Sequence, residues 1–179
     1  MENSIHLPHL SEIESMRNAG LGQMEFARTY TLQLLDNVSE EIWQQSPQGI
    51  PTHFAWQVGH LAIAQYGLML FRQRGRVEGD LDLMPGWFRK RYGRGSSPTN
   101  ESATHPCKTE MLAILENIHR SSMEFMRTAP PELLIEPTEM PYAAFPIKLG
   151  AFLFCPLHES IHAGQIGLLR RAHGLAPIR

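Results

Sequence analysis

The chain has 179 residues, of which 42% are hydrophobic and 19% are charged, and its formal net charge is −2. This length and composition predict one globular domain, residues 1–179, with a substantial core. The charge excludes the basic footprint of nucleic-acid binding, and two cysteines are too few for a disulfide scaffold. The sequence shows neither an apolar run of about 18 residues nor a signal peptide, so we expect a cytoplasmic protein without membrane or nucleic-acid partners.

The first predicted helix covers residues 11–37. Ser11 and Glu14 have the spacing of a capping box, and apolar residues then recur every three or four positions. Gly20 and Gly22 weaken the middle of this stretch, which leaves open a main helix that begins only after them.

The second predicted helix covers residues 53–74, between a cap at Thr52 and a stop at Gly75. Its sequence, HFAWQVGHLAIAQYGLMLFRQR, is mostly apolar, which indicates a buried helix. His60 lies inside this run. A single histidine in such a place is more often a hydrogen-bonded core residue than a ligand, so its meaning depends on what the other helices supply.

Residues 76–108 form a connection that is too long and too rich in aromatic residues to be a plain loop. We expect short helical turns that pack over one end of the domain and form a lid over a site. The basic residues of this segment are typical of a solvated loop, but in a lid they favour an anionic substrate: Arg89, Lys90, Arg91 and Arg94.

The third predicted helix covers residues 106–129. Cys107 lies near its start, where a helix N-terminus can lower the pKa of a thiol, although structural burial is the favoured interpretation. His119 falls at the surface or boundary of the same helix.

A loop at residues 132–145 leads to the fourth predicted helix, residues 147–173, in which Pro156 should cause a kink. No stretch alternates apolar and polar residues for long enough to indicate a sheet. The chain is therefore predicted to be all-α, with four long helices and one long crossover connection between the second and the third.

The fourth helix contains the string HESIH, in which His158 and His162 lie one turn apart on the same face. Two imidazoles with this spacing can bind one zinc ion, and Glu159 completes the H-E-x-x-H pattern of zinc proteases. The protease interpretation fails on the third ligand. Gln165 and Leu168 stand where the extended pattern requires glycine and histidine, and no acidic residue follows Glu159.

His60 is the better third ligand, because helical bundles build sites from residues on facing helices. A set of His60, His158 and His162 leaves one coordination position open, as catalytic zinc sites do. Three imidazoles suit Zn, and also Ni, Fe or Cu. Glu159 is a candidate catalytic base, although it lies about 100° around the helix from the ligand face. His53 or Glu159 as a fourth ligand would close the site instead.

Three stretches of the sequence resemble one known family: AWQVGHLAIAQ (55–65), MPGWFRKRYGRGSSP (84–98) and LHESIHAGQIGLLRRAHG (157–174). They identify the chain as similar to the DinB/YfiT-like superfamily of metal-dependent proteins. This resemblance implies an up-down-down-up four-helix bundle that often forms a homodimer. It also implies a metal site of three histidines, which maps onto His60, His158 and His162. Members of known activity are metal-dependent thiol transferases and thiol-dependent isomerases.

Three functions follow from these observations. The first is a metal-dependent transferase that acts on a small-molecule substrate with a low-molecular-weight thiol. The second is a hydrolase in which a metal-bound hydroxide is the nucleophile. The third is a metal-binding or interaction bundle without turnover, in which a fourth protein ligand fills the coordination sphere.

Overall fold

The computed structural model describes residues 7–98, 105–139 and 145–178, and within these ranges the protein is helical without any strand. This confirms the predicted all-α class. Residues 99–104 of the long connection and 140–144 of the predicted loop lie outside the described residues. None of the described helices has the length and apolar character needed to cross a bilayer.

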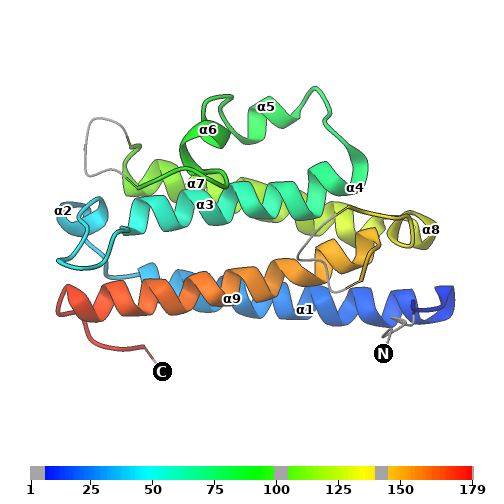
Figure 1. The fold of residues 1–179 in the computed structure, drawn as a ribbon, viewed down its shortest axis with the longest axis horizontal. Helices are drawn as coiled ribbons and strands as arrows, with labels where there is room; N and C mark the ends of the chain where they lie inside the picture. Colours follow the sequence, from blue (N-terminus) through cyan, green and yellow to red (C-terminus); the bar gives the residue numbers. More distant parts are fainter. Residues whose placement is uncertain (1–6, 99–104, 140–144, 179) are drawn as a thin grey trace.

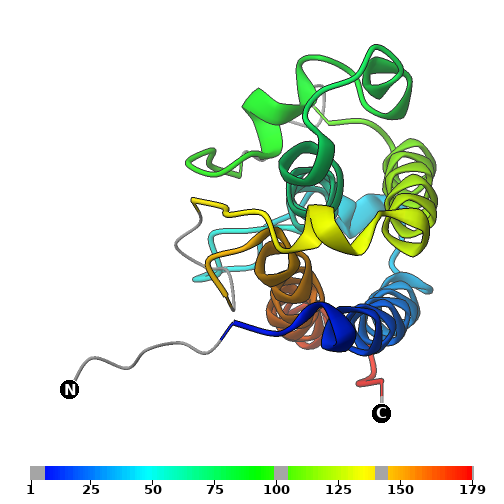
Figure 2. The same cartoon turned by 90° about the vertical axis from the view of Figure 1, so that its right-hand side faces the viewer.

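Four long helical segments form the body of the protein (Figure 1). They are α1 (Leu10–Leu35), α3 (Phe54–Tyr66) with its continuations η1 (Gly67–Phe71) and α4 (Arg72–Arg74), α7 (Lys108–Thr128), and α9 (Lys148–Ala172). α9 lies along α1, and α3 lies along α7, with the core between the two pairs (Figure 2). The up-down-down-up order of the four segments stays a prediction.

The first helix begins earlier than the sequence suggested. α1 starts at Leu10, and the Glu12 carboxylate accepts a hydrogen bond of 2.8 Å from the His9 backbone N–H. The predicted capping box at Ser11 is therefore wrong. The helix also runs through Gly20 without a break, because its packing against α9 outweighs the low helix propensity of glycine.

The start of α3 is capped by His53 rather than by Thr52. The Nδ1 atom of His53 accepts a 3.2 Å hydrogen bond from the backbone N–H of Trp56. The Thr52 hydroxyl instead accepts a hydrogen bond from the side chain of Gln57. The helical segment ends at Gly75, as predicted, where a φ of 75° stops the helix.

Short helices occupy the long connection, as predicted (Figure 1). They are α5 (Asp80–Leu83) and α6 (Phe88–Tyr92), and α6 packs on α3. Phe88 and Tyr92 are fully buried. Gly59 of α3 makes room for the Tyr92 ring, which a Cβ atom at this position would overlap. The connection is thus fastened to α3.

Two further short helices complete the described chain: α2 (Glu40–Trp43) and α8 (Pro131–Leu134). α8 lies where the sequence predicted only loop. Pro131 occupies its first turn, where the missing backbone N–H of proline costs no hydrogen bond. α9 continues through Pro156, whose carbonyl accepts a 2.8 Å hydrogen bond from the Ser160 hydroxyl.

The contact between α1 and α9 depends on Gly20. A Cβ atom on Gly20 would lie 2.7 Å from Phe152 and 2.8 Å from Leu153, whereas a Cβ atom on Gly22 meets nothing within 4 Å. We predict that Gly20→Ala lowers the free energy of unfolding by about 1–3 kcal/mol through overpacking. Gly22→Ala, the matched control, should raise it by up to about 1 kcal/mol. Urea unfolding followed by circular dichroism measures both, and an equal effect at the two positions would contradict the assigned packing.

Candidate metal centre

Three histidines from two helices converge in the structure. His60 lies on α3, and His158 and His162 lie one turn apart on α9. One ring nitrogen from each lies within 4.8 Å of the others, and the ring centroids are 4.5–5.2 Å apart. Nitrogen ligands around one tetrahedral zinc lie about 3.3 Å from each other. The three side chains are therefore close enough to bind a single ion after small rotations.

His60 is held in one tautomer by the connection that packs on α3. Its Nδ1 atom lies 2.7 Å from the backbone oxygen of Tyr92. A carbonyl oxygen only accepts hydrogen bonds, so Nδ1 carries the proton and the lone pair of Nε2 stays available to a metal. The indole of Trp56 stacks on the imidazole, with centroids 4.9 Å apart and planes 6° from parallel. These contacts set the tautomer of His60 and restrict the rotation of its ring.

His162 is oriented by Gln57, a residue that the sequence reasoning missed. Nδ1 of His162 lies 2.6 Å from Oε1 of Gln57. The Gln57 amide nitrogen donates to the hydroxyl of Thr52 and to the side-chain oxygen of Gln165, at 2.9 and 2.8 Å. Oε1 therefore faces His162 as an acceptor, which again leaves Nε2 for a metal. The signal for this role is a glutamine one turn before His60 in an otherwise apolar run.

Burial keeps the imidazoles neutral. Burial and then the charges of His158 and His60 lower the pKa of His162 to about 3. Burial and the charge of His60 lower the pKa of His158 to about 4, although Glu159 opposes this shift. The pKa of His60 is also lowered by burial, against the opposing effect of its hydrogen bond to Tyr92. Neutral imidazole is the form that binds metal ions, so protons compete little for this site near pH 7.

Two of the three histidines open onto a cleft. The cleft has a volume of about 630 Å³ and is lined by His60 and His158 together with side chains of η1, α4 and the connection. Met84, Pro85 and Arg89 are among the residues that the connection contributes. The predicted lid thus forms one wall of a cavity that reaches the histidine cluster. A small molecule in this cleft would meet the open side of a bound metal.

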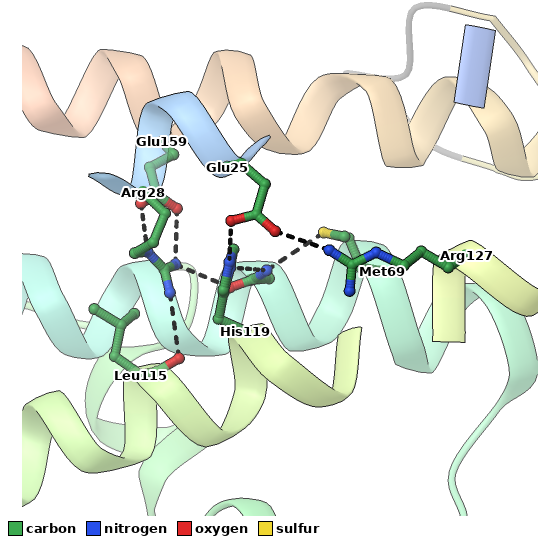
Figure 3. Close-up of polar contacts among 8 residues, drawn as sticks. Glu25, Arg28, Met69, Leu115, His119, Arg127 and Glu159 are labelled. Carbon is green, nitrogen blue, oxygen red and sulfur yellow. Dashed lines mark hydrogen bonds and ion pairs between the residues drawn. The ribbon is translucent and has the colours of Figure 1, made fainter. Parts of the chain in front are cut away.

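Glu159 is not part of the cluster. It forms a buried ion pair with Arg28 of α1 (Figure 3). Nε and Nη2 of Arg28 donate to the two carboxylate oxygens, at 2.7 and 2.8 Å. Arg28 also donates to Oε1 of Gln65 at 2.9 Å and to the backbone oxygen of Leu115 at 3.3 Å. Catalysis by Glu159 stays a prediction, and the commitment of both oxygens to Arg28 weighs against it.

The polar network around Arg28 extends to α7, as Figure 3 shows. Gln65 lies 3.1 Å from Nδ1 of His119, and Nε2 of His119 lies 3.5 Å from the Glu25 carboxylate. His119 is only 7% exposed, so its predicted surface or boundary position is wrong. His119 faces polar groups of α1 and α3. The sequence pattern of α7 alone does not reveal these partners.

Two other predicted positions differ in the structure. His53 is fully buried and lies outside the histidine cluster, with its ring 4.7 Å from that of His105. Cys107 is exposed, so the favoured structural burial of its thiol is wrong. Cys107 is the N-cap residue of α7, and a cap position lies at the surface more often than a residue inside the helix.

Comparison with known families agrees with the resemblance seen in the sequence. The model of the DinB superfamily matches residues 23–166, a segment that contains all three histidines of the cluster. The chain therefore belongs to the DinB superfamily. A search of curated proteins found no match.

The Arg28–Glu159 pair gives a stability prediction. Arg28→Met leaves a buried carboxylate without its partner, which costs about 3–5 kcal/mol of unfolding free energy. The double variant Arg28→Met/Glu159→Met should recover most of this loss. As a control, Arg127→Met removes the half-exposed pair with Glu25 and should cost less than about 1 kcal/mol. Urea unfolding measures all three, and a mild Arg28→Met variant would show that the pair is not fully desolvated.

The lowered pKa values of the histidines give a pH prediction for the metal-free chain. His158 and His162 titrate near pH 6.5 when unfolded but near 4 and 3 when folded. Below pH 6.5 the unfolded state binds more protons than the folded state. The free energy of unfolding therefore decreases as the pH is lowered, by up to about 1.4 kcal/mol per pH unit for each histidine. Unfolding experiments between pH 7 and 5 should show a flatter profile for His158→Gln/His162→Gln than for the wild type. Parallel profiles would contradict the assigned burial.

Proposed function

We propose that this member of the DinB superfamily is a metal-dependent transferase that joins a low-molecular-weight thiol to an electrophilic small molecule. Zinc is the first candidate for the metal, with Ni, Fe and Cu as alternatives. One observation carries the proposal: three neutral imidazoles from α3 and α9 converge beside a cleft that two of them line.

The donor set fits a catalytic metal better than a structural one. Structural zinc sites are closed by four protein ligands, whereas catalytic sites use three and keep one position for substrate. The cluster found among the described residues has three members. The two residues considered as a fourth ligand are engaged elsewhere, His53 as the cap of α3 and Glu159 in its pair with Arg28. This arrangement supports an enzyme over a closed binding site.

The chemistry proposed for the cleft needs a thiolate. A metal at the histidines would act as a Lewis acid that lowers the pKa of a thiol and holds its sulfur in place. The thiol proton passes to water, the sulfur forms a bond to a carbon of the electrophile, and the leaving group departs with the electrons of the bond that breaks. His60 and His162 are held for this role by Tyr92 and Gln57, and the connection supplies part of the cleft lining.

A hydrolase is the weaker candidate. A general base beside the metal would assist hydrolysis by taking a proton from the attacking water. Glu159 is the acidic residue next to the ligands in sequence, and both of its oxygens accept hydrogen bonds from Arg28. The resemblance to thiol transferases favours a reaction in which a thiol replaces water as the nucleophile.

Metal content tests the ligand set. We predict that the purified wild-type chain binds one divalent ion, and that His158→Ala and His162→Ala lower the bound metal to background. His173→Ala is the control, because His173 is the C-cap residue of α9 and contacts the backbone oxygen of Gln45 outside the cluster. Inductively coupled plasma mass spectrometry gives the stoichiometry. Full metal content in either ligand variant would refute the triad.

A screen of metal-loaded protein tests the reaction. The wild type should accelerate the displacement of chloride from a chloronitroarene by at least one of several small thiols, as followed by absorbance. His60→Ala should lower this rate by at least about a hundredfold, because the ligand set is then incomplete. Ester hydrolysis without any thiol-dependent turnover would favour the hydrolase, and neither activity would favour a binding protein.

A further inference from the structure

The cleft beside the histidines carries an excess of positive charge. Arg72 of α4 lines it, and three arginines of the connection line it as well: Arg76, Arg89 and Arg94. Among the described residues that line this cleft, Asp80 is the one with a carboxylate. Guanidinium groups gathered around a concave surface raise the local concentration of anions.

The carboxylate of Asp80 is already neutralised by a residue outside the cleft lining. Arg74 donates to its two oxygens at 2.7 and 3.3 Å. The Tyr66 hydroxyl and the Val77 backbone N–H also donate to it, at 2.9 and 3.0 Å. Asp80 is only 3% exposed. It therefore does not offset the charge of the cleft arginines.

Arg72 and Arg89 are close enough for their charges to act on each other. Partial burial, and then the charge of Arg89, lower the pKa of the Arg72 guanidinium. Nη1 of Arg72 donates to the backbone oxygen of Gly67 at 3.2 Å. Neither arginine forms an ion pair with a carboxylate of the described residues. Two like charges that repel each other across one cleft are stabilised by an anion that binds near both.

The basic residues that line the cleft are only partly those of the basic run in the sequence. Arg89 belongs to the basic run of the connection, and it lines the cleft. Lys90 and Arg91 belong to the same run but do not line it, and Arg91 lies 5.1 Å above the Trp87 ring instead. Arg72 comes from a different element, and it joins Arg89 only in the folded chain.

We propose that Arg72 and Arg89 bind an anionic group of the thiol substrate, a carboxylate or a phosphate, while the thiol sulfur lies at the histidines. The reacting end then faces His60 and His158, which line the same cleft. A guanidinium presents paired N–H donors that match the two oxygens of such a group. The identity of the reacting end rests on the proposed transferase function, whereas anion binding by the arginines does not.

Anion binding is tested on the full chain after its metal has been removed with a chelator, so that the probe cannot bind to metal. Inorganic pyrophosphate and tricarballylate are titrated separately by calorimetry at an ionic strength of about 0.15 M, where long-range attraction is screened beyond about 8 Å. Arg72→Met/Arg89→Met is compared with Lys90→Met/Arg91→Met. Both pairs remove two positive charges, but only the first removes arginines that line the cleft.

The wild type and the Lys90→Met/Arg91→Met variant should bind at least one of the two probes with similar affinity. The Arg72→Met/Arg89→Met variant should bind the same probe at least about tenfold more weakly. The probe with the higher affinity shows whether phosphate or carboxylate is preferred. Equal loss of affinity in the two double variants, or no binding of either probe to the wild type, would overturn the proposal. If the Arg72→Met/Arg89→Met variant does not fold, Arg89→Met alone is compared with Arg91→Met by the same criteria.

A second comparison separates this inference from the proposed function. With metal-loaded protein, a thiol that carries carboxylates should react at lower concentration than its methyl ester, and Arg72→Met/Arg89→Met should remove this difference in KM. Anion binding without any thiol turnover would refute the transferase and leave the arginine site intact. Turnover with equal KM for acid and ester would refute the arginine site and leave the transferase intact.

Discussion

The buried ion pair between Arg28 and Glu159 sets the rotation of α9, and the candidate site depends on this rotation. Consecutive residues of a helix are turned by about 100° from each other. When Glu159 faces Arg28 of α1, the neighbouring His158 and its partner His162 face α3 and meet His60. The glutamate of the HESIH string thus has a structural contact here, while the two histidines around it supply the candidate ligands.

Polar groups in the core connect this ion pair, the histidines and the lid. Gln57 and Gln65 lie two turns apart on α3 and serve different partners, His162 in the first case and Arg28 with His119 in the second. Tyr92 couples the connection to the site, because its carbonyl holds His60 and its hydroxyl lies 2.9 Å from Nδ1 of His105. Burial raises the pKa of Tyr92 to about 12, so this hydroxyl keeps its proton. A movement of the connection would therefore disturb His60.

The helical class, the stop at Gly75 and the grouping of His60 with the HESIH histidines could be predicted, since they follow from periodicity, glycine chemistry and residue spacing. The first residues of the helices could not be predicted, because backbone angles and local contacts decide which residue caps a helix. His53 caps α3, where the sequence indicated Thr52. His119 and Gln57 were beyond the sequence for another reason. The partner of His119 is Gln65, which lies 54 positions earlier in the chain, and the partner of Gln57 is His162, which lies 105 positions later. Neither contact leaves a pattern within one helix.

The central claim is that His60, His158 and His162 hold one metal ion through nitrogen and leave a position open to the cleft. X-ray absorption spectroscopy at the edge of the bound metal tests it most directly. We predict three imidazole nitrogens at about 2.0–2.1 Å for zinc, together with one exchangeable oxygen ligand that is replaced by sulfur when a small thiol is added. A shell of four protein ligands that does not change with thiol would contradict it.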